Sequence, residues 1–149
     1  MNPRAALAVL AVGLLAVSAP SQLAAKECAP VMKEGWVRMP PSAMPMMAGF
    51  GRLMNPCPAP ATIVSASSPA FADVSIHESR IVDGVNRMRA LDQLRLVPDG
   101  SAVLKPGGLH LMLMQPRAPL KEGSKVVVSF KLSDGREILS ELVVRKPAP

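Results

Sequence analysis

The chain is divided by 16 prolines and 10 glycines into short segments, and this division limits the folds that it can adopt. After residue 25, the segments show almost no helical periodicity and are rich in residues that favour strands. Short β-prone segments separated by proline and glycine clusters are typical of antiparallel sandwiches and barrels. The sequence therefore predicts an all-β fold.

Two hairpin signals organise the expected strands. Asp83-Gly84 is a two-residue type I′ turn sequence, and residues 133–136 (Ser-Asp-Gly-Arg) join the last two strands. We find no internal repeat and no domain linker, so a single domain is expected. The expected strands cover residues 33–39, 50–54, 62–67, 74–82, 85–96, 109–114, 125–132 and 137–144.

Residues 1–25 have the pattern of a secretory signal peptide. A positive charge at Arg4 precedes an apolar run over residues 5–17, and small residues then lead to an expected cleavage site after Ala25. The run is shorter than the roughly 20 apolar residues that a transmembrane helix needs. No later segment is long and apolar enough to cross a bilayer. We therefore expect an exported protein whose mature domain is a β-sandwich of residues 26–149 without a membrane span.

The net charge of +6 is scattered along the chain without a basic run. Three Phe, one Trp and no Tyr offer little surface for stacking nucleobases, so we expect no nucleic-acid binding. We interpret the charge as favouring solubility and acidic protein partners. The sequence also lacks a Ser/His/Asp arrangement and an acidic metal cluster, and we therefore do not expect an enzyme.

Cys28 and Cys57 are the two cysteines of the chain. Export places them in an oxidising compartment, which favours a structural disulfide. The alternative is a thiol pair that binds metal or exchanges electrons, but their wide separation is unlike a CxxC motif. If the thiols are joined, methionine is the soft sulfur ligand that remains.

The chain has two histidines, His77 and His110, and each has a methionine nearby on the same expected sheet face. Side chains alternate along a strand, so His110, Met112 and Met114 share one face while the intervening leucines share the other. If the first hairpin has its predicted two-residue turn, His77 and Met88 are diagonal neighbours on one face. Periodicity leaves open whether these two groups meet.

Two imidazoles and two thioethers form a neutral, soft ligand set that suits Cu(I) better than an oxygen-preferring ion. Zn(II) would prefer thiolate, imidazole or carboxylate ligands. We therefore predict a Cu(I) site with His77, Met88, His110 and Met112 as ligands, and Met114 as an auxiliary ligand because it shares their strand face. The alternative is that both histidines are hydrogen-bonded structural residues.

A second group of methionines, Met44, Met46 and Met47, lies among prolines between the first two expected strands. Proline is excluded from central strands, so we expect these methionines in a loop. Flexible methionines can fill a gap under such a loop, or they can form an auxiliary thioether cluster near the metal. The sequence leaves both interpretations open.

The four predicted ligands have the spacing His-x10-Met-x21-His-x-Met. Further motifs surround them: Trp36-Val37-Arg38 followed by Pro40-Pro41, Asn55, Val-Ser-Ala-Ser-Ser-Pro-Ala at 64–70, and Pro-Gly-Gly-Leu-His-Leu-Met at 106–112. In these residues the chain resembles the periplasmic copper chaperones called PCuAC over most of its mature length. The resemblance implies a cupredoxin-like Greek-key β-sandwich that carries Cu(I) in the periplasm of a Gram-negative bacterium.

The resemblance also implies a copper acceptor, the subunit of cytochrome c oxidase that carries the CuA centre, and often a Sco-type thiol protein alongside. We expect a monomer. Three features depart from the family pattern. Residues 145–149 lack the Met and His of the copper-binding tail of many relatives, residues 39–47 are unusually rich in methionine, and the cysteine pair is not part of the signature.

Two functions of other classes remain as alternatives. An electron-transfer cupredoxin would need a Cys thiolate with its two histidines, and neither cysteine lies near His77 or His110 in the sequence. The other alternative is an all-β protein-binding module without a delivery role.

Overall fold

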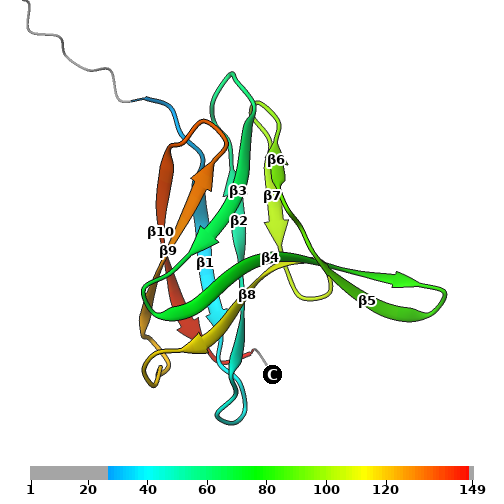
Figure 1. Cartoon of the computed structure of the whole chain (residues 1–149), viewed down its shortest axis with the longest axis vertical. Helices are drawn as coiled ribbons and strands as arrows, with labels where there is room; N and C mark the ends of the chain where they lie inside the picture. Colours follow the sequence, from blue (N-terminus) through cyan, green and yellow to red (C-terminus); the bar gives the residue numbers. More distant parts are fainter. Residues whose placement is uncertain (1–26, 148–149) are drawn as a thin grey trace, which may run out of the picture.

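The computed structural model describes residues 27–147, which form strands and turns and no helix (Figure 1). The prediction of an all-β fold is thus confirmed. None of these residues belongs to a helix that could cross a membrane. The predicted signal peptide, residues 1–25, lies outside the described residues. The strands are β1 Val31–Arg38, β2 Met46–Met54, β3 Ala61–Ser67, β4 Phe71–Val82, β5 Val85–Ala90, β6 Leu94–Leu96, β7 Ser101–Leu104, β8 Leu109–Pro116, β9 Lys125–Leu132 and β10 Glu137–Arg145.

All ten strands belong to one sheet that curves back on itself. The strand order is β5-β4-β8-β7-β2-β1-β10-β9-β3-β6, and β2 also pairs directly with β8. A further pairing at Ala66 and Val74 joins β3 to β4 and closes the sheet into a barrel-like shape. Most neighbours are antiparallel, whereas β1 and β10, and likewise β7 and β8, run parallel. The closed sheet leaves β5 as a projecting edge strand (Figure 1).

The core lies inside this curved sheet and is filled by every second side chain of its strands. Val126, Val128 and Phe130 of β9 are fully buried. Lys125, Val127 and Lys131, which alternate with them, are exposed. Leu111 and Leu113 of β8 are also fully buried. This alternation fixes which face of each strand is left for function, because a shift of one residue would turn the apolar side chains outward.

β2 begins at Met46, four residues before the strand that the sequence predicts. Met46 and Met47 follow Pro45 directly. Proline is tolerated at a strand boundary because only its own backbone N–H is missing from the ladder of hydrogen bonds. The carbonyl oxygen of Pro45 accepts a hydrogen bond from the backbone nitrogen of Gln115 at 2.6 Å. The loop prediction is therefore wrong for Met46 and Met47, although Met44 does lie in the connection before β2.

Two other expected strand boundaries also differ. The predicted strand 85–96 is divided into β5 and β6, because the chain leaves β4 after Ala90 and then pairs with β3 instead. The four-residue β7 was not predicted, and it lies between β2 and β8. Strand pairing of this kind depends on distant partners that local periodicity does not reveal.

The β4–β5 hairpin projects from the barrel (Figure 1). Asp83 and Gly84 have positive φ angles of 52° and 75°, as a type I′ turn requires at both central positions. Val82 pairs with Val85 and Ser79 with Met88, which confirms the predicted register. The hairpin thus places Met88, on the exposed edge strand β5, directly beside Ser79 of β4.

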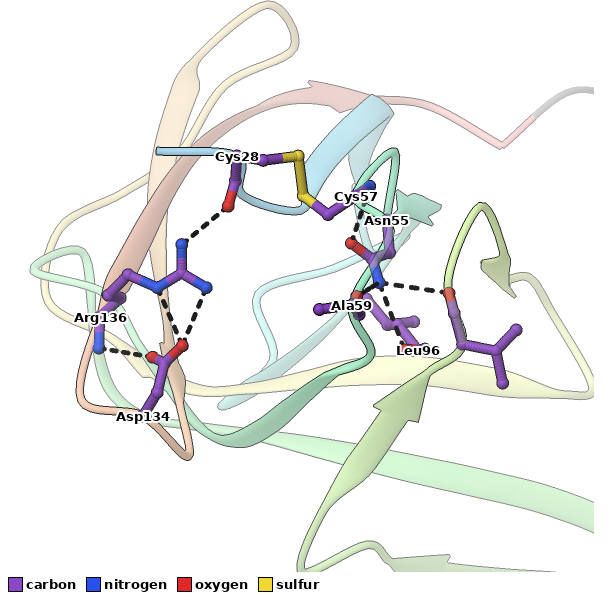
Figure 2. The surroundings of a disulfide bond; sticks show 8 residues. Cys28, Asn55, Cys57, Ala59, Leu96, Asp134 and Arg136 are labelled. Atoms are coloured by element: carbon purple, nitrogen blue, oxygen red, sulfur yellow. Dashed lines mark hydrogen bonds and ion pairs between the residues drawn. A yellow bond between two sulfur atoms is a disulfide. The ribbon is translucent and has the colours of Figure 1, made fainter. Parts of the chain in front are cut away.

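A disulfide joins Cys28 to Cys57, with Cα atoms 5.7 Å apart, and confirms the predicted pairing (Figure 2). The buried Asn55 amide donates to the carbonyl oxygens of Ala59 at 2.9 Å and Val97 at 3.2 Å. Arg136 donates to the carbonyl oxygen of Cys28 at 2.7 Å. Together these contacts fasten the N-terminal segment to the β2–β3 connection and to the β9–β10 turn.

Candidate metal centre

The two groups of predicted ligands meet because β4 and β8 are neighbouring antiparallel strands. His77 of β4 lies directly opposite His110 of β8. Their ring centroids are 5.9 Å apart, and the ring planes are inclined by 39°. The sequence predicts the face of each histidine on its own strand, but the pairing of the two strands is a result of the fold.

The hairpin brings Met88 to the same place. Its sulfur atom lies 3.2 Å from Nε2 of His110, although the two residues are 22 positions apart. Met88 is opposite Ser79 on β4, one diagonal step from His77. Its side chain is 53% exposed, whereas that of His110 is 7% exposed. The centre therefore has one deeply held imidazole and one accessible thioether.

The backbone determines which nitrogen of His110 is free. Nδ1 of His110 lies 2.9 Å from the carbonyl oxygen of Gly108, and a carbonyl oxygen can only accept, so Nδ1 carries the hydrogen in this contact. In the neutral ring, Nε2 then presents a lone pair to the sulfur of Met88, which also offers lone pairs. Two facing lone-pair donors favour a cation between them. A hydrogen bond from the other ring nitrogen to a backbone carbonyl is also how metal-binding histidines are oriented.

His77 has a similar arrangement with different partners. Its Nε2 lies 3.0 Å from the hydroxyl oxygen of Ser75 on the same face of β4. Its Nδ1 is buried and has no hydrogen-bond partner. Burial lowers the pKa of the His77 imidazole below its usual value, the nearby His110 lowers it further, and Asp73 opposes the shift. The lowered pKa favours the neutral ring, which keeps a lone pair for a ligand.

The remaining predicted ligand, Met112, follows His110 on the outer face of β8. It lies opposite Ser75 on β4 and opposite Ala48 on β2, and it is partly buried. Its place is thus one residue pair along from the two histidines. Met114 is one pair further on the same face, opposite Met46 of β2.

The three methionines of the proline-rich segment, Met44, Met46 and Met47, occupy different positions in the fold. Met47 points into the core, is 6% exposed and lies opposite Leu113, so it is a packing residue. Met46, its neighbour in the chain, is 39% exposed and lies on the outer face. Met44 is 43% exposed in the connection before β2. Of the three methionines, Met44 and Met47 line one pocket, and Met46 lies apart from them opposite Met114.

Charged residues occupy the other face of the hairpin, because Glu78 and Arg89 alternate with His77 and Met88 along the two strands. Glu78 accepts from Arg80 at 2.8 Å and from Arg89 at 3.1 Å. Arg80 and Arg89 are exposed, and Glu78 neutralises part of their positive charge. In residues 27–147 there is no group of three or more His, Cys, Asp or Glu side chains placed to hold a metal.

The sequence analysis did not predict two residues that contact the histidine rings, Ser75 and Gly108. Ser75 precedes His77 by two residues on the same face of β4, and Gly108 precedes His110 by two residues, just before β8 begins. The alternation of faces could have revealed Ser75, whose hydroxyl can bond a ring nitrogen. It could not have revealed Gly108, because the contact comes from a backbone carbonyl.

Comparison with known protein families assigns this chain to a family. Residues 31–144 match the family described as putative lipoprotein LpqE-like. The chain belongs to the LpqE-like family. This LpqE-like protein is 35% identical over 105 residues to a putative lipoprotein of Leifsonia xyli subsp. xyli, a match that covers 70% of this chain and 62% of that one. It is 28% identical over 88 residues to an uncharacterized protein of Rickettsia prowazekii, covering 58% of this chain and 49% of that one. It thus spans less than two thirds of either relative.

Solved structures similar in fold to this LpqE-like protein include PCuAC domains. The Cu(I) form of DR1885 from Deinococcus radiodurans superposes with a TM-score of 0.61 at 24% identity, covering 85% of this chain and 83% of that one. The copper-bound PCuAC domain from PmoF2 gives 0.63 at 18% identity, covering 78% and 92%. The resemblance to PCuAC proteins and the cupredoxin-like fold class are thereby confirmed.

Proposed function

We propose that this LpqE-like protein binds one Cu(I) ion as cargo through His77, Met88, His110 and Met112. The observation that carries the proposal is the 3.2 Å approach of the Met88 sulfur to Nε2 of a histidine whose other nitrogen is bonded to a backbone carbonyl. The site offers imidazole and thioether donors, which are neutral and soft and therefore suit Cu(I). The copper-bound PCuAC domains of the same fold support the choice of metal.

Carriage rather than storage is supported by the position of the ligands. Met88 is 53% exposed on a projecting hairpin, so an acceptor can approach the ion from that side. Ligands of the acceptor can then replace those of the carrier one at a time. We propose that this exchange occurs in the periplasm and that the acceptor carries the CuA centre of cytochrome c oxidase, with a Sco-type thiol protein as a further partner.

The state of the cysteines counts against electron transfer. Blue-copper sites use a Cys thiolate with two His ligands. In this structure both cysteine sulfurs are bonded to each other, and neither is available to the histidines. A copper carrier is therefore the better interpretation of the same fold.

A competition titration of the reduced mature protein with Cu(I), followed by X-ray absorption, tests the proposal. We expect one tightly bound Cu(I) per chain, nitrogen and sulfur in its coordination shell, and much weaker binding of Zn(II). A shell without sulfur, or equal affinity for Zn(II), contradicts the proposal. Transfer to a purified CuA domain tests the acceptor separately, because binding without transfer would exclude only the delivery step.

A further inference from the structure

The outer face of the barrel carries a second pair of thioethers beyond the histidines. Met114 of β8 and Met46 of β2 lie directly opposite each other. Directly opposite residues of antiparallel strands have Cβ atoms about 4.5–5.5 Å apart. Methionine side chains are unbranched and have three rotatable bonds, so both sulfurs of such a pair can reach one ion.

Neither methionine of this pair belongs to the hydrophobic core. Met46 is 39% exposed, and its chain neighbour Met47 supplies the core contact instead, at 6% exposure. On the other side of Met114 lies Asp73, an exposed carboxylate in register on β4. A negative charge beside two neutral sulfurs compensates the charge of a bound monovalent cation.

The pair is also connected to the histidine centre along one strand. Met112 and Met114 are two residues apart on β8, so their Cα atoms are about 6.5–7 Å apart from the strand rise. The outer face thus carries a row of thioethers, Met46, Met114 and Met112, that ends beside His110. Met44, two residues before Met46, is not part of this row, because it lines a pocket together with Met47.

We propose that Met46 and Met114 form a second, weaker Cu(I) site that captures the ion and passes it to Met112 and the histidine centre. Capture depends only on the thioether pair, whereas the passage step rests on the proposed function of the histidine centre. Each step exchanges one neutral ligand of Cu(I), a thioether or a neutral imidazole, for another, so the oxidation state and the proton count do not change. The site is specific to soft monovalent ions because it offers no imidazole and no thiolate.

The test compares the wild type with a Met46→Leu/Met114→Leu variant, which keeps apolar bulk and removes both sulfurs. The probe is Cu(I) supplied as its bicinchoninate complex. We expect the wild type to bind two Cu(I) at excess and the double variant to bind one. We also expect the tight affinity to stay within about twofold, and loading of the tight site to slow by about fivefold or more.

Two matched variants serve as controls. Met47→Leu changes a buried methionine of the same strand, and Met54→Leu changes a 37% exposed methionine that lies opposite Val31 and Ser101 rather than another methionine. Both should bind two Cu(I) and load at the wild-type rate. Two Cu(I) on the double variant, or unchanged loading, would overturn this inference.

A third variant separates this inference from the proposed function. His110→Ala should lose the tight ion and keep the weak one. If it keeps the tight ion, the proposed function fails. If the wild type binds a single Cu(I) that His110→Ala removes, the Met46–Met114 site fails while the proposed function stands.

Discussion

The hydroxyl oxygen of Ser75 lies 3.0 Å from Nε2 of His77, two residues along the same face of β4. This contact leaves the buried Nδ1 as the ring nitrogen without a partner. Ser75 therefore positions the His77 ring, and it would act on a bound metal only through the orientation of that ring. Partners of this kind affect metal affinity by about 10–100-fold in other proteins.

Ser75→Ala should weaken Cu(I) binding by about tenfold, because the His77 ring loses the bond that fixes its orientation. The number of nitrogen and sulfur scatterers in X-ray absorption should not change. Ser101→Ala, at an exposed position of β7, should have no effect on either measurement. Loss of one scatterer in the Ser75 variant would instead make the hydroxyl a ligand.

Met88→Leu should lower Cu(I) affinity by at least about tenfold, or about 1.4 kcal/mol. The side chain is 53% exposed, so the free energy of unfolding should stay within about 0.5 kcal/mol of the wild type. Competition titration and urea unfolding measure the two quantities. Val85→Leu on the same hairpin should change neither, and an equal loss of affinity there would point to hairpin distortion.

Neighbouring substitutions on β8 should have opposite effects. Leu111 is fully buried in the core, so Leu111→Ala should cost about 2–5 kcal/mol of stability and leave Cu(I) affinity in the folded protein nearly unchanged. Met112→Ala should cost less stability but weaken Cu(I) binding by about tenfold or more. Similar affinities in both variants would contradict the assignment of Met112 as a ligand.

Replacing both cysteines by serine should lower the free energy of unfolding by about 2–4 kcal/mol, since the bond between Cys28 and Cys57 restricts the unfolded chain. Cu(I) affinity should not change, because neither sulfur takes part in the centre. Thiol quantification of the unfolded wild type should find no free cysteine. A large loss of Cu(I) binding in the double variant would show that a cysteine sulfur belongs to the site.

Local patterns predicted the parts of the centre that depend on one strand or one turn. The sequence Leu-His-Leu-Met-Leu-Met alternates strictly, so the leucine face and the His/Met face followed from the pleat. The Asp83-Gly84 turn then set the register that places His77 and Met88 on one face. Both predictions required only neighbours within a few residues.

Contacts between distant strands were beyond such reasoning. The pairing of His77 with His110 depends on β4 and β8 being adjacent, which many sheet orders would not provide. The entry of Met46 into β2 depends on β8 as its partner, and the proline before it suggested a loop. The Gly108 carbonyl has no side-chain signal at all.

The hairpin that carries Met88 also sets a sequence of events for a bound ion. β5 pairs only with β4 and all its residues are exposed, so it opens at a lower free-energy cost than the barrel strands. His110 is nearly buried and is held by the Gly108 carbonyl. Met88 would therefore leave the ion first and His110 last, and the lifetime of the loaded state would follow the fraying of one exposed edge strand rather than the unfolding of the domain.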